Sequence, residues 1–105
     1  AILWVNDTGA EKPNQIPGPG QKNDQNSPNA WAPLAYDPKL DIVYVPTGVG
    51  TPDIWGGNRT KLHERYAISM LAINATTGKL IWNFQPTHHD LWDMDVPSQP
   101  TLADI

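Results

Sequence analysis

The chain has 105 residues, of which 39% are hydrophobic and 17% are charged, with 11 prolines, 8 glycines and no cysteine. The net charge of −4 and the lack of a basic cluster argue against a nucleic-acid partner, and no apolar run approaches the roughly 20 residues that span a bilayer. The composition excludes a disulfide framework and favours one small unit with a marginal core.

The two ends of the chain are apolar. Residues Ala1–Val5 form an uninterrupted apolar run, which predicts a strand without a charged leader before it, and the last residue is Ile105. We therefore expect the 105 residues to be an excerpt of a longer protein. From Asn6 to Asn29 the only branched aliphatic residue is Ile16, so residues 1–30 are expected to be an irregular loop segment that follows a short strand.

Two β-hairpins are predicted in the rest of the chain. The first pairs the apolar stretch 31–36 with the β-branched run 41–47 around an Asp-Pro turn, and residues 48–59 then have the glycine and proline content of a loop. The second pairs 66–74 with 79–85, where Leu80, Trp82 and Phe84 are expected on one face and Ile81 on the other. No helix cap precedes a ten-residue periodic stretch, so we expect an all-β fold.

The densest polar cluster lies at His88–Asp95. Imidazole and carboxylate groups suit zinc or iron, but neighbouring side chains in an extended segment point in opposite directions, so His88 and His89 cannot both face one ion without a sharp turn. The alternative is a structural corner in which His and Asp groups bond the backbone. Asp93, beside the indole of Trp92, is a candidate general base because partial burial raises the pKa of a carboxyl group.

Several motifs resemble one family. The stretch Ala72–Trp82 resembles the tryptophan docking motif of the eight-bladed propellers of quinoprotein dehydrogenases, with Asn74 where Asp is more usual. The stretches 26–33, 51–60 and 88–95 resemble the membrane-bound quinoprotein glucose dehydrogenase group, which includes quinate and polyol enzymes. The resemblance implies one to two four-stranded antiparallel blades of a β-propeller, with residues 31–105 as the blade segment that carries the docking motif and the active-site corner.

The resemblance also implies roles for individual residues. Trp31 stands where the family stacks an indole on pyrroloquinoline quinone (PQQ), and Thr51 stands where a polar residue lies near the quinone. Asp93 stands at the catalytic carboxylate, beside a divalent cation (Mg²⁺ or Ca²⁺) that it helps to bind. Alcohol-oxidising relatives have an Asn metal ligand where this chain has Val49, whose apolar side chain cannot bind a hard cation, so the metal shell is expected to differ.

The implied activity is the oxidation of a sugar, with glucose as the first expectation, or of a polyol. Electrons would pass to ubiquinone on the periplasmic side of the bacterial inner membrane, with the membrane anchor outside this stretch. The isolated segment is expected to be inactive, because the remaining cofactor contacts would lie on other blades. The competing hypothesis is a non-catalytic propeller scaffold that binds other proteins. Such a scaffold would keep Trp82 but would have no need of Trp31 and Asp93 together.

Overall fold

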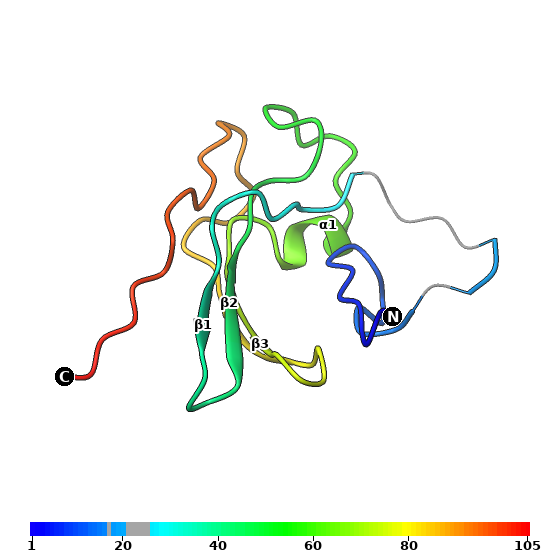
Figure 1. Cartoon of the computed structure of the whole chain (residues 1–105). Coiled ribbons are helices and arrows are strands. Elements are labelled where there is room, and N and C mark those ends of the chain that lie inside the picture. Colours follow the sequence, from blue (N-terminus) through cyan, green and yellow to red (C-terminus); the bar gives the residue numbers. More distant parts are fainter. Residues whose placement is uncertain (17, 21–25) are drawn as a thin grey trace.

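Four antiparallel strands form a single sheet in the order β1-β2-β3-β4. The computed structural model describes residues 1–16, 18–20 and 26–105. The elements are β1 (Ala35–Asp37), β2 (Ile42–Pro46), the five-residue helix α1 (Lys61–Arg65), β3 (Met70–Asn74) and β4 (Leu80–Phe84) (Figure 1). Within the described ranges, no helix has the length and apolar character needed to span a membrane.

Both predicted hairpins are confirmed, and local side chains shape their turns. In the first turn, the Asp37 carboxylate accepts hydrogen bonds from the backbone N–H of Lys39 (2.8 Å) and of Leu40 (3.2 Å). In the second turn, the Asn74 side-chain oxygen accepts from the N–H of Thr77 (2.8 Å), and Gly78 closes the turn at φ +73°. An Asx-type bond and a left-handed glycine are the ordinary means of reversing a chain between two strands.

The alternation predicted for β4 is only partly correct. Trp82 lies opposite Ala72, but Leu80 lies opposite Ile73, so the register shifts by a bulge at this point. Because successive residues of a strand point to opposite faces, the bulge moves Leu80 off the face that Trp82 and Phe84 share. On that face, the Trp82 ring lies against Tyr44 of β2, with ring centroids 5.9 Å apart.

The N-terminal prediction needs a correction. Residues 1–5 form no strand in this structure. Instead, the Trp4 indole donates a hydrogen bond to the carbonyl of Ala75 (2.8 Å) and lies against Gly78, so the segment is fastened to the β3–β4 turn rather than to a sheet edge. Of the loop predicted over residues 6–29, positions 17 and 21–25 lie outside the described residues, and the remainder contains no helix or strand.

Helix α1 was not expected from the sequence. The Thr60 side chain accepts from the N–H of His63, and the His63 ring accepts from the N–H of Thr60, both at 3.3 Å, which makes a reciprocal cap. His63 stands where Glu or Gln usually completes such a cap. A five-residue helix is also too short to show hydrophobic periodicity, so neither of the usual sequence signals was present.

Most buried hydrophobic residues lie in β3 or beyond one end of the sheet, and Ile42 of β2 is also buried. The central strand β3 is buried along Leu71, Ala72 and Ile73. A second buried cluster of Val49, Ala67 and Ile68, with Val96 packed against it, lies outside the strands. In an antiparallel sheet, the starts of β1 and β3 and the ends of β2 and β4 share one end, opposite the two hairpin turns. The second cluster is therefore the packed base of the segments that meet at that end.

Candidate active site

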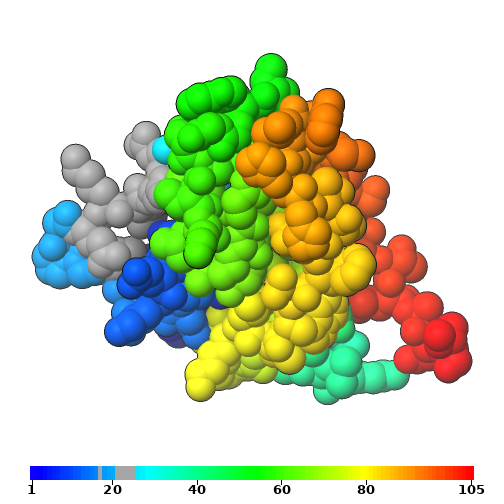
Figure 2. Space-filling model, turned by 180° about the vertical axis from the view of Figure 1, so that it is seen from behind, coloured from blue at the N-terminus to red at the C-terminus, as the bar shows by residue number. Residues whose placement is uncertain are grey.

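Three loops meet at this end of the sheet. They are residues 26–34 before β1, residues 47–59 after β2, and the corner, defined as residues 88–95, after β4. In Figure 1 the loop after β2 (green) and the corner (orange) both lie beyond the strands, on the side away from the hairpin turns. Figure 2 shows the same two segments side by side on the opposite face of the molecule. Topology alone thus brings Trp31, Thr51 and Asp93 to one end of the sheet.

One buried carboxylate shapes the corner. Asp90 is 1% exposed, and its two side-chain oxygens accept from the N–H of Trp92 (3.2 Å) and of Met94 (2.8 Å). Backbone φ values of 58° at Asp93 and 43° at Asp95 place both residues in the left-handed region. Asp tolerates this region better than most residues because its short side chain bonds locally. The structural role expected of Asp90 is therefore confirmed.

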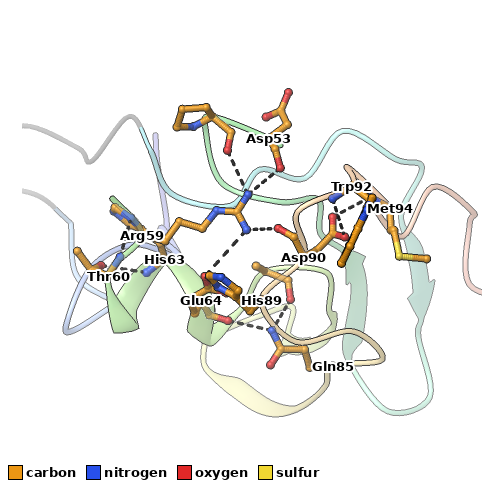
Figure 3. Close-up of polar contacts among 12 residues, drawn as sticks. Asp53, Arg59, Thr60, His63, Glu64, Gln85, His89, Asp90, Trp92 and Met94 are labelled. Carbon is orange, nitrogen blue, oxygen red and sulfur yellow. Dashed lines mark hydrogen bonds and ion pairs between the residues drawn. The ribbon is translucent and has the colours of Figure 1, made fainter. Parts of the chain in front are cut away.

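Arg59 connects the loop after β2 to the corner (Figure 3). Its guanidinium group donates to the carbonyls of Pro52 (3.1 Å) and Asp53 (2.7 Å), and also to the carbonyl of Asp90. The Arg59 side chain is 2% exposed. A rigid fork with five N–H donors can satisfy several carbonyls at once, which the single ammonium of a lysine does less well. Arg59 therefore fixes the backbone around Thr51 relative to the backbone that leads to Asp93.

Helix α1 braces the same corner from the other side. The His89 ring nitrogen Nδ1 lies 2.7 Å from the Glu64 carboxylate, which is also 4.0 Å from the Arg59 guanidinium. The Gln85 amide donates to the carbonyls of Glu64 (2.9 Å) and Ala67 (2.7 Å), so the end of β4 is tied to the segment that follows α1. His89 therefore contacts a side chain of α1 and not the backbone partner expected for the histidines of the corner.

Trp31 is held by a carboxylate of the corner. Its indole N–H donates to Oδ2 of Asp95 (3.0 Å), and the N–H of Val49 donates to Oδ1 of the same side chain (3.0 Å). Trp31 is nonetheless 58% exposed. The polar edge of the indole is therefore fixed while much of its surface stays open. Asp95 is two residues from Asp93 along the chain, so this bond ties Trp31 to the segment that carries Asp93.

The Asp93 side chain is exposed and lies in a negative environment. Partial loss of hydration raises the pKa of its carboxyl group, and the negative charges of Asp95, Asp53 and Asp90 raise it further. A raised pKa makes a carboxylate a better proton acceptor, and exposure leaves it open to a substrate. A cation placed beside Asp93 would oppose the repulsion among these carboxylates.

The remaining predictions for the site have different outcomes. Thr51 is exposed and precedes a cis peptide bond to Pro52, in the segment that Arg59 holds. Within the ranges that the structure describes, no three His, Cys, Asp or Glu side chains gather as a metal site.

Sequence reasoning missed the roles of Arg59 and Asp95. Asp95 was part of the polar cluster, but only the fold shows that its partners are Trp31 and Val49.

Comparison with known proteins identifies the family. The family model for the glucose/ethanol/alcohol dehydrogenase β-propeller domain matches residues 1–105. The chain belongs to this dehydrogenase family. Among its relatives, quinoprotein glucose dehydrogenase A of Acinetobacter calcoaceticus is 80% identical over 104 residues, which are 99% of this chain and 13% of that protein. The quinoprotein glucose dehydrogenase of Escherichia coli K12 is 66% identical, over the same shares of the two chains.

More distant dehydrogenases also match this chain, one of them in structure. The quinate/shikimate dehydrogenase (quinone) of Acinetobacter baylyi is 44% identical, over 99% of this chain and 13% of that protein. The crystal structure of the quinohemoprotein alcohol dehydrogenase of Comamonas testosteroni superposes with a TM-score of 0.58 at 29% identity, over 76% of this chain and 12% of that one. The predicted all-β propeller fold is thereby confirmed. The chain spans only about an eighth of the length of its curated relatives.

Proposed function

We propose that this chain is a segment of a PQQ-dependent dehydrogenase that oxidises a sugar, glucose first, or a related polyol. The observation that carries the proposal is the unit formed by Trp31, Asp95 and the corner. It presents an open indole and an exposed carboxylate of raised pKa from one end of the sheet. The names of the glucose and quinate relatives support this range of substrates.

The residues present fit the cofactor. A planar ring ligand needs a flat apolar surface that is held in place, and Trp31 offers one, because its edge is bonded while 58% of its surface remains exposed. When bound, PQQ would accept the two electrons released by the alcohol. Thr51 stands in the loop that Arg59 holds and would supply a polar contact near the quinone.

Asp93 is the proposed catalytic base. Oxidation of a hydroxyl group to a carbonyl group requires removal of the hydroxyl proton, and a carboxylate oxygen of Asp93 would accept it. Partial loss of hydration and the nearby carboxylates of Asp95, Asp53 and Asp90 raise the pKa of Asp93, and a cation bound beside it would lower that pKa again. Asp93 would also be one ligand of a divalent cation, Mg²⁺ or Ca²⁺, since hard cations prefer carboxylate oxygens. Because no three His, Cys, Asp or Glu side chains gather in the described ranges, the other ligands would come from other oxygen groups, such as backbone or amide carbonyls.

The test uses the full-length protein that contains this segment. The protein without cofactor is reconstituted with PQQ and either Mg²⁺ or Ca²⁺, and dye reduction is measured with glucose and with quinate. Asp93→Asn should lower kcat by about 10²- to 10⁴-fold, the usual contribution of a general base. Asp104→Asn is the matched control, because the Asp104 side chain is 97% exposed in this segment and, among the described residues, pairs with the surface residue Lys39. Undiminished turnover in Asp93→Asn would exclude the catalytic role. A total lack of quinone-dependent turnover would favour the scaffold alternative.

The electron acceptor and the location form a further part of the proposal. In a periplasm-facing enzyme of the inner membrane, ubiquinone would take the electrons from the reduced cofactor, at a site outside these 105 residues. Membrane fractions that contain the full-length protein should therefore reduce a short-chain ubiquinone when glucose is added. Reduction of dyes without reduction of ubiquinone would contradict this assignment and leave the dehydrogenase activity intact.

A further inference from the structure

The Asp95 carboxylate uses both of its oxygens on two different segments. Oδ2 accepts from the indole N–H of Trp31, and Oδ1 accepts from the backbone N–H of Val49, each at 3.0 Å. A carboxylate can do this because both oxygens are acceptors, whereas an amide offers only one. Charge-assisted bonds of this kind are also stronger than neutral ones.

The surroundings of Asp95 hold the carboxylate in one place. The next residue, Val96, packs against the buried cluster that includes Val49 and Ile68. On the other side, the backbone of Gly48 is fixed by its N–H, which donates to Asn29 (2.9 Å), and by its carbonyl, which accepts from Ile68 (3.2 Å). A side chain on Gly48 would collide with the Asp95 carboxylate. The absence of a Cβ at this position is what lets the carboxylate lie against the loop after β2.

We infer that Asp95 is a positioning residue for the cofactor: it sets the orientation of the Trp31 ring relative to the loop after β2. This inference rests on the proposed function, because it takes Trp31 as the surface on which the quinone stacks. In this segment the indole is 58% exposed, and the bond at its edge ties the orientation of its ring to the Asp95 carboxylate. Asp95 therefore acts on quinone binding through Trp31 and not by touching the quinone.

The measurement is PQQ affinity, obtained by equilibrium dialysis of the full-length protein without cofactor and without substrate. Asp95→Asn keeps the size of the side chain but leaves one of the two N–H donors without an acceptor. It should weaken PQQ binding by about tenfold, the effect of one charge-assisted hydrogen bond. In a Trp31→Phe background the indole N–H is gone, and the same change should alter the affinity by no more than about twofold. Asp104→Asn is the control for the loss of one negative charge.

The arms of this experiment separate the two claims. If Asp95→Asn weakens binding equally in the native and the Trp31→Phe backgrounds, or not at all, the inference is overturned while the proposed function stands. If Trp31→Ala leaves the PQQ affinity unchanged, the indole is no cofactor contact and the inference fails; if the unsubstituted protein binds no PQQ, the proposed function fails as well. Should Asp95→Asn not fold, Gly48→Ala displaces the same carboxylate without removing its charge. Gly48→Ala should weaken PQQ binding in the native background and have little effect in the Trp31→Phe background. An equal effect in both backgrounds, or no effect in either, would overturn the inference.

Discussion

Arg59 donates a hydrogen bond to the main-chain carbonyl of Asp90, 31 residues further along the chain. The same guanidinium bonds the carbonyls of Pro52 and Asp53, so a single side chain joins the two loops that carry Thr51 and Asp93. The planar guanidinium group already presents its donors in a fixed arrangement, so little side-chain entropy is lost for each hydrogen bond that it forms.

Replacement of Arg59 by Lys should loosen both loops. The ammonium group cannot reach all three carbonyls, and backbone amides in 53–55 and 88–94 should exchange hydrogen about tenfold faster in the full-length protein. The kcat should fall by a larger factor than the KM rises, because the carboxylate of Asp93 is then held less firmly in position. Hydrogen exchange followed by mass spectrometry checks this, with Lys79→Gln in the far hairpin turn as control. Unchanged protection in both segments would show that Arg59 does not hold them.

Removal of the Asp90 side chain should unfold the corner locally. In Asp90→Ala the N–H groups of Trp92 and Met94 lose their acceptor, at a cost of about 1–2 kcal/mol, as for a lost helix cap. Amide exchange over residues 91–95 should rise by about five- to thirtyfold, because about 1.4 kcal/mol corresponds to a factor of ten. The prediction fails if these amides exchange as slowly as in the unmodified protein.

The Asp41 carboxylate gives the stability of the sheet a pH dependence. Hydrogen bonds from Thr76, then from Asn74 and Tyr36, lower the pKa of Asp41 below its ordinary 3.8. Its contribution to stability is therefore present above pH 3.8 and is lost as the pH falls through the lower folded-state pKa. Thermal unfolding midpoints of the native protein and of Asp41→Asn, which tolerates the φ of 54°, should differ at neutral pH and converge in acid. A difference that stays constant into strong acid would contradict the assignment.

Gly78 is required both by its backbone angle and by its neighbour. Its φ of +73° disfavours any side chain, and a Cβ would lie 2.5 Å from the Trp4 ring. Gly78→Ala should destabilise the second hairpin by about 1–2 kcal/mol and release Trp4 from the turn. Gly18→Ala is the matched control, since a Cβ there meets nothing within 4 Å. Equal exchange rates for residues 74–80 in both variants would refute the prediction.

The isolated 105 residues should have no dehydrogenase activity. The chain spans about an eighth of its curated relatives, and the β4 strand leaves Trp82 and Phe84 exposed at 44% and 65%. Exposed strand edges and apolar faces favour association of such a segment. Dye reduction by the purified segment with PQQ and either cation should be indistinguishable from that of a blank. Any quinone-dependent reduction above the blank would disprove this.

The sheet could be predicted from the sequence because its signals are local. The Asp-Pro turn, the Asn74–Gly78 turn and the β-branched run in β2 each specify a hairpin within a few residues. The same local rules failed for the bulge in β4, which depends on pairing with β3, and for α1, whose cap uses His63. The segment 1–5 was wrongly predicted as a strand because apolar content does not show whether a partner strand is present.

The site could be predicted only through family resemblance. Residue types marked Asp93 as a possible base, but nothing local connects Trp31 with the corner 64 residues away. That connection is made by Asp95 across the end of the sheet. Arg59 escaped notice for the same reason, since its three acceptors are main-chain carbonyls, which carry no sequence signal. Roles that depend on distant backbone groups become visible only when the chain is folded.

The way in which Asp90 holds the corner has a use in enzyme engineering. Its carboxylate accepts from the backbone N–H groups of residues 92 and 94, which every residue except proline carries, so the path of the loop does not depend on which other side chains those positions carry. Both side chains face outward, Trp92 at 74% and Met94 at 59% exposure, on either side of Asp93. A combinatorial library at these two positions would therefore vary what approaches the carboxylate while the loop that presents it keeps its course.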